Sequence, residues 1–111
     1  MNWDDRDDIL RALDTLCPMH CLLDRRGRIR HAGPTLRKLR PQEAICDTPF
    51  LDLFELTHPR DVTDMAALRA AAGRRTRLRL RFRDSPRTDL HGVLVPQGQG
   101  GAIVNLGFGI S

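Results

Sequence analysis

Hydrophobic residues recur at helical spacing at the start of the chain and at strand spacing near its end. Segment 3–16 is predicted to form an amphipathic helix, because its apolar side chains fall on one side. Aspartates occupy its first turns, where the helix dipole favours negative charge, and Pro18 ends it. The apolar stripe of this helix consists of Trp3, Ile9, Leu10, Leu13 and Leu16.

Five other segments carry the pattern of β-strands. Segments 19–24 and 28–31 flank an Arg-Arg-Gly turn, which predicts a hairpin. Segment 76–83 alternates apolar and basic residues, so one face of this strand is apolar and the other is basic. Segments 89–95 and 102–108 follow it and complete an antiparallel meander. The basic face of segment 76–83 carries Arg77, Arg79, Arg81 and Arg83.

The middle of the chain is predicted to be helical. Segment 35–40 favours a short helix that ends at Pro41, and segment 49–56 favours one or two further turns. Segment 60–72 is predicted to form a longer helix, because its apolar residues share a face and Gly73 stands where a C-terminal cap belongs.

The order of these elements predicts an α+β fold, in which a five-stranded antiparallel sheet carries short helices on one face. The 111 residues suffice for one domain, and 41% hydrophobic with 29% charged residues is ordinary for a globular protein. We expect residues 1–17 to form a helix for dimerisation or capping, and residues 18–111 to form the main domain.

Scattered residues from Cys17 onward carry a resemblance to a known family. In chain order they are Cys17, Pro18, Met19, His20, Asp24, Gly27, Gly33, Leu36, Phe50, Phe54, Pro59, Leu90, Gly92 and the closing run 103–106. Their order resembles a PAS domain of the H-NOX-associated family. That domain lies between the haem nitric-oxide sensor and the output domain of soluble guanylate cyclases, and occurs in bacterial histidine kinases and diguanylate cyclases.

The resemblance implies a regulatory domain that dimerises and relays a signal to a cyclase or kinase. We expect it to bind no cofactor. Its implied partners are a second copy of the chain and an H-NOX-type gas-sensor protein. The alternative is a PAS sensor that binds haem or another small ligand in a cavity between sheet and helices. Residues that would face such a cavity, or form plain core, are Leu22, Phe54, Met65, Leu68, Leu80 and Val104.

The run Cys17-Pro18-Met19-His20-Cys21 gathers three residue types that bind metals. Its cysteines are not spaced as in a zinc knuckle, and His20 and Cys21 would point to opposite faces of a strand. We therefore predict no metal site here. An odd number of cysteines also argues for free thiols.

His58 is the one candidate for a haem ligand, because haem-binding PAS domains use a histidine near the main helix. An exposed or capping histidine beside Pro59 is the favoured interpretation, since a lone histidine carries little information. Cys46 lacks the surroundings of a flavin-reactive cysteine and is predicted to be small and buried.

Charge is segregated along the chain. Five aspartates lie between residues 4 and 14, whereas seven arginines lie between residues 74 and 87. The arginine face is interpreted first as a solvated surface and second as a docking surface for the acidic helix, within or between subunits. Nucleic acid is the weakest interpretation, because no aromatic residues are interleaved and no recognition motif is present.

Catalysis has little support in the sequence. There is no motif for a serine nucleophile, and no Gly-rich phosphate loop precedes a helix. The acidic N-terminus differs from a signal peptide, and no apolar run is long enough to cross a membrane. We therefore expect a cytoplasmic domain that has no enzymatic activity and binds no membrane.

Overall fold

The computed structural model describes residues 3–41, 44–72 and 76–108, with side chains except those of residues 3–6, 72 and 76. In chain order the elements are α1 (Trp3–Leu16), β1 (His20–Leu23), β2 (Ile29–Ala32), α2 (Pro34–Leu39), α3 (Phe50–Leu53), β3 (Phe54–His58), α4 (Met65–Ala72), β4 (Thr76–Phe82), β5 (Asp89–Pro96) and β6 (Ala102–Phe108).

The described strands form one antiparallel sheet in the order β2-β1-β6-β5-β4-β3. The sheet thus has six strands, whereas the sequence predicted five. The additional strand is β3, which occupies part of segment 49–56, where helical turns were expected. Phe54 and Leu56 face the apolar side of β4 opposite Phe82 and Leu80, and this pairing favours a strand over a helix.

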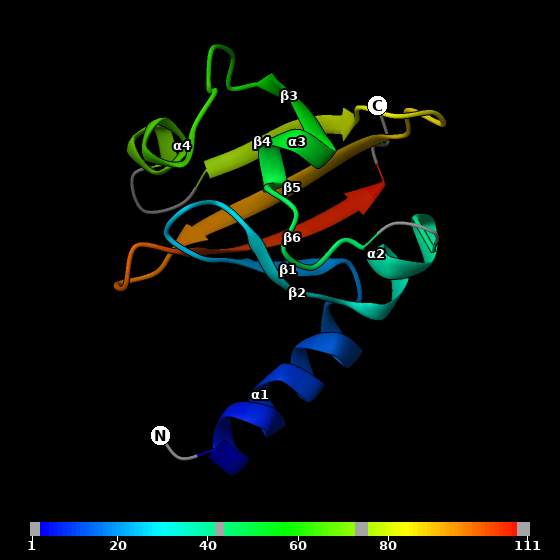
Figure 1. The fold of residues 1–111 in the computed structure, drawn as a ribbon, viewed down its shortest axis with the longest axis vertical. Helices are drawn as coiled ribbons and strands as arrows, with labels where there is room; N and C mark the ends of the chain where they lie inside the picture. Colours follow the sequence, from blue (N-terminus) through cyan, green and yellow to red (C-terminus); the bar gives the residue numbers. More distant parts are fainter. Residues whose placement is uncertain (1–2, 42–43, 73–75, 109–111) are drawn as a thin grey trace.

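The helices are unevenly distributed around the sheet. Figure 1 shows α3 in front of the sheet, α2 and α4 toward its two ends, and α1 extending away from it beyond β2. The main core lies between the sheet and helices α2 to α4. At its centre Phe54 stacks between Phe50 and Phe82, with ring centroids 4.9 and 4.8 Å apart. We call this covered side of the sheet the inner face.

Helix α4 begins at Met65, five residues later than the start predicted at residue 60. A side-chain oxygen of Asp64 accepts a hydrogen bond from the backbone N–H of Ala67 at 2.7 Å, which is the geometry of a helix N-cap. Val62 lies before the helix but still packs against the core. The cap expected at Gly73 lies outside the described residues.

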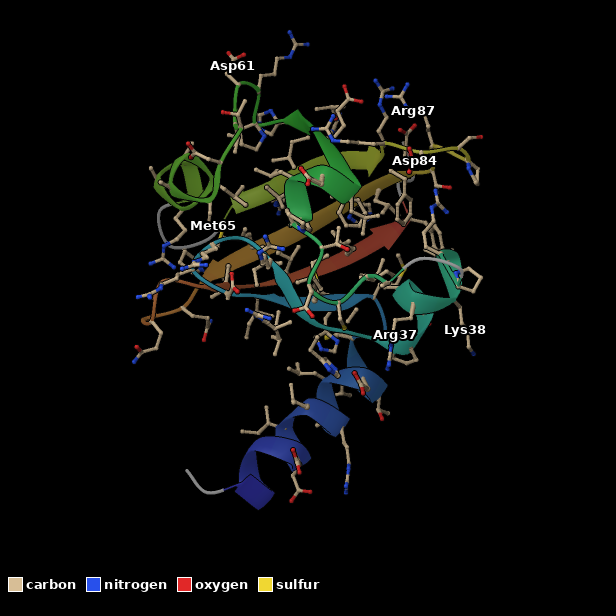
Figure 2. The ribbon with its side chains drawn as sticks, viewed as in Figure 1. Arg37, Lys38, Asp61, Met65, Asp84 and Arg87 are labelled. Carbon is tan, nitrogen blue, oxygen red and sulfur yellow. The ribbon has the colours of Figure 1, made fainter. Side chains whose placement is uncertain are left out.

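Arg40, at the end of α2, is the one charged side chain that the described residues bury. Its guanidinium lies 3.8 Å from the centre of the Phe82 ring and donates hydrogen bonds to the backbone carbonyls of Asp84 and Pro86. Figure 2 shows Asp84 on the turn between β4 and β5. Arg40 therefore joins α2 to that turn, and these bonds offset part of the cost of burying a charge.

Candidate functional site

Three polar side chains meet where α1 joins the sheet. Asp14 lies in the last turns of α1, His20 begins β1, and His31 lies in β2. In the strand register His20 lies opposite Asn105 and His31 opposite Leu22, so both imidazoles lie on the face of the sheet away from α2 to α4. We call this the outer face. The two imidazole centroids are 5.1 Å apart.

Hydrogen bonds fix these three side chains, which we call the junction cluster. His31 Nε2 lies 2.8 Å from Asp14 Oδ1, and His20 Nδ1 lies 2.8 Å from the backbone carbonyl oxygen of Cys17. His20 is fully buried, whereas Asp14 and His31 are about one-quarter exposed. The cluster therefore ties the end of α1 to β1 and β2, with one side open to solvent.

Gly33 packs closely against His20, one member of the junction cluster. Its N–H donates to the carbonyl oxygen of His20 at 2.8 Å. A Cβ atom at Gly33 would lie 2.4 Å from the carbonyl oxygen of Pro18 and 3.1 Å from His20 Nδ1. The chain can pack this tightly only because residue 33 has no side chain.

The structure separates the ligands that the sequence placed together. His20 and Cys21 lie on opposite faces, as predicted, since Cys21 pairs with Val104 on the inner face. Burial raises the pKa of the Cys21 thiol to about 12, so this thiol stays protonated. Cys17 contributes its backbone carbonyl oxygen to His20. Sequence reasoning missed Asp14 and His31, because only the hairpin register and the direction of α1 bring them to His20.

The outer face carries an apolar row across three strands. Leu22 of β1 lies opposite Ile103 of β6, which in turn lies opposite Val95 of β5. Val93 lies two residues before Val95 on the same face of β5, between Asn105 of β6 and Arg77 of β4. Leu22 and Ile103 are half-buried, and Val95 is 42% exposed. No described helix covers this row, which is therefore an apolar surface next to polar neighbours.

The basic side of β4, which we call the arginine row, lies on the same face of the sheet as the apolar row. Arg77 and Arg79 are exposed there. Arg81 donates to Glu55 across the β3–β4 pair at 3.1 Å, and Arg87 forms an ion pair with the same carboxylate.

Arg83, the fourth arginine of the basic face predicted for segment 76–83, lies beyond the end of β4. Its Nε donates to the carbonyl of Leu51 at 2.8 Å, so it does not extend the basic row. The acidic helix α1 leaves the sheet at the opposite edge, so within one chain it does not lie across the arginines (Figure 1).

The apolar stripe of α1 is only partly covered within the chain. Ile9 is 45% exposed and Leu16 is 78% exposed, while Leu10 and Leu13 are half-buried. The side chain of Trp3 lies outside the described residues.

The predicted ligand cavity is largely filled by side chains. Phe54, Leu68, Leu80 and Val104 are buried in the core, and Leu22 lies on the outer face, contrary to the expectation that it faces the cavity.

A groove of about 180 Å³ lies between α3, α4 and the β1–β2 turn. Met65 lines it from the first turn of α4 (Figure 2). This volume is smaller than the roughly 300 Å³ at which small-molecule pockets begin.

The two remaining candidates of the sequence lie at the surface. His58 ends β3, is exposed, and lies opposite Arg79 in an open depression that also contains Thr57 and Arg60. Cys46 is exposed, which corrects the prediction of a buried residue. In the loop between α2 and α3 its neighbour Ile45 fills the core in its place.

Comparisons with known proteins show the fold. The PAS domain of nitrogen regulation protein NR(II) from Vibrio parahaemolyticus matches with a TM-score of 0.64 and 15% identity, over 90% of this chain and 96% of that one. A PAS domain of a Desulfitobacterium hafniense protein matches with a TM-score of 0.62 and 12% identity, over 88% of this chain and 98% of that one. The chain therefore has a PAS fold.

No family model matches the sequence, and no curated protein matches it. Among the described residues, no helix has the length and apolar character required to cross a lipid bilayer.

Proposed function

We propose that this chain is a regulatory PAS-type domain that dimerises and relays a signal, and that it has no catalytic role of its own. The observation that carries the proposal is a pair of apolar surfaces that the described part of the chain leaves partly uncovered. One is the stripe of α1, and the other is the row on the outer face.

The exposed parts of these surfaces favour a second copy of the chain as the partner. A helix that extends away from its domain, with Leu16 and Ile9 exposed, gains stability when it packs against the same helix or the outer face of another subunit. A two-fold axis near α1 would bury both stripes at once. The arginine row then offers an attractive surface to the aspartates of the partner helix.

We further propose that the signal comes from a nitric-oxide or haem-linked pathway and is passed to a nucleotide cyclase or kinase. The support for this finer assignment is the resemblance that begins at Cys17-Pro18-Met19-His20 and continues through Gly33. An H-NOX-type gas sensor is the partner protein that this resemblance suggests.

Paired substitutions in α1 test the dimer. Replacing Leu10 and Leu13 by aspartate puts two charges into the proposed interface and should weaken dimerisation more than about 100-fold, as expected for central interface residues. Arg11→Asp changes the net charge by the same amount on the other side of the helix, and should leave the dimer intact. Sedimentation velocity measures both variants, and circular dichroism checks that each variant folds.

Three results would contradict the proposed interface: a monomeric wild-type chain, an unchanged dimer in the double leucine variant, or equal loss in the Arg11 variant. A dimer that dissociates at high salt would assign most of the affinity to the pairing of aspartates with arginines, because salt screens exposed charges. A dimer that persists at high salt would assign it to the apolar stripe.

A further inference from the structure

We propose that Asp14, His20 and His31 form a binding site for one divalent transition-metal ion, with zinc as the best fit. The three residues offer two imidazole nitrogens and one carboxylate oxygen, which all lie within 4.8 Å of one another. Imidazole with carboxylate is a ligand set that zinc accepts, whereas calcium and magnesium prefer oxygen atoms alone.

The state of His20 is the observation that points to an ion. Its Nδ1 faces the carbonyl oxygen of Cys17, which can only accept, so Nδ1 carries the proton of the neutral ring. Its Nε2 then has a free lone pair. Among the described residues this fully buried nitrogen has no hydrogen-bond partner. Leaving a buried acceptor unsatisfied costs free energy, and a metal ion would satisfy it.

The surroundings of His20 are those of a metal ligand. Histidines that bind metals usually donate their second N–H to a carbonyl or carboxylate, which fixes the tautomer and the ring orientation. The Cys17 carbonyl does this at 2.8 Å, and tight packing of Gly33 behind the ring holds its position. Nε2 consequently points toward Asp14, whose Oδ1 lies 3.9 Å away.

Two of the three separations between ligand atoms are close to those around an ion of this size, and the third lies within 4.8 Å. Tetrahedral zinc with bonds of about 2.1 Å places its ligand atoms roughly 3.4 Å apart. The distances from Asp14 Oδ1 to His31 Nε2 and to His20 Nε2 are 2.8 and 3.9 Å, so they lie on either side of that value. Small side-chain rotations would therefore admit the ion, which replaces the hydrogen bond between Asp14 and His31.

The exposure of the cluster provides both access and an open coordination position. Asp14 and His31 are 27% and 25% exposed, so an ion can enter from their side while His20 closes the other. Three protein ligands leave a fourth position for water. Since the ligands come from α1, β1 and β2, the ion would fix the angle at which α1 leaves the sheet. All three ligands belong to one chain, so this proposal does not rest on the proposed dimer.

Zinc titration of the chain without an affinity tag tests this proposal. The protein is first stripped with a chelator and then titrated calorimetrically with Zn²⁺, and absorbance is recorded with Co²⁺ as a probe. We expect one ion per chain, and at least about 10-fold weaker binding in Asp14→Asn and in His31→Ala. Both changed residues are partly exposed, and circular dichroism checks that the variants fold.

Matched controls distinguish zinc binding at the junction cluster from incidental zinc binding elsewhere on the chain. Asp8→Asn and His91→Ala remove the same groups at exposed positions on α1 and β5, and should leave the affinity unchanged. The Co²⁺ complex should lack the near-ultraviolet charge-transfer band of a thiolate ligand. The proposal is overturned if the wild type binds no zinc, if both cluster variants keep full affinity, or if Cys46→Ser abolishes binding.

Discussion

Replacing Gly33 by alanine should destabilise the domain strongly, because the added methyl group has no room. The new Cβ would lie 2.4 Å from the carbonyl oxygen of Pro18, so one backbone segment must move by roughly 0.6 Å to restore even a tight contact of 3.0 Å. That oxygen accepts hydrogen bonds from the N–H groups of Thr35 and Leu36, at 3.0 and 3.3 Å. Moving it therefore weakens the start of α2 as well.

The magnitude follows from the cost of overpacking, which is about 1–3 kcal/mol in a tightly packed site. With an unfolding entropy of about 2.1 cal/mol/K per residue, 1 kcal/mol corresponds to roughly 4 °C for a chain of this length. Gly33→Ala should lower the melting temperature by roughly 4–13 °C. It should also lower the urea midpoint without changing the slope of the transition.

Gly98 provides the matched control, because a Cβ atom there meets no heavy atom within 4 Å. Gly98→Ala should leave the free energy of unfolding within about 0.5 kcal/mol of the wild type. If Gly33→Ala is as stable as Gly98→Ala, the close contact between residue 33 and Pro18 is not a feature of the folded protein. The packing of Gly33 would then not be what holds the His20 ring in position.

Two further predictions concern ionisable groups. Cys21 should resist alkylation at pH 8 until the domain unfolds, because a thiol with a pKa of about 12 is ionised in roughly one molecule in 10,000 at that pH. The exposed Cys46 should react at once. Mass spectrometry of the labelled chain measures both reactions, and rapid labelling of Cys21 would contradict its burial. The hydrogen bond from Arg81, assisted by Arg87, lowers the pKa of Glu55 below its usual value of 4.5. The ionised Glu55 therefore stabilises the fold above about pH 4.5, and this stabilisation is lost as the pH falls through the lowered pKa. The difference in urea midpoint between wild type and Glu55→Gln should shrink below about pH 4.5, and a difference independent of pH would refute the pairing.

Local pattern was enough to predict most of the sheet. The alternation of leucine with arginine in segment 76–83 indicates a strand with one buried face, and β4 has Leu78 and Leu80 buried and Arg77 and Arg79 exposed. Strand β3 could not be predicted in this way. Its apolar residues Phe54 and Leu56 continue from the short helix α3, and only pairing with β4 decides between helix and strand.

The junction cluster lay beyond prediction for a similar reason. Asp14, His20 and His31 share no motif spacing, because a helix end, a proline and a hairpin turn separate them. The sequence drew attention to His20 through its neighbouring cysteines, yet strand alternation sends Cys21 to the opposite face. A prediction of the cluster would have needed the β1–β2 register and the direction of α1, and both are tertiary properties.

The placement of α1 makes it a lever arm. Its 14 residues span roughly 21 Å, and the cluster at Asp14 lies near the end that meets the sheet. A tilt of only about 10° there would carry the far end of the helix through roughly 3–4 Å, which is most of the distance between neighbouring residues on adjacent strands. A tilt of α1 too small to disturb the core would thus displace the far end of the helix enough to change which side chains of a partner it contacts.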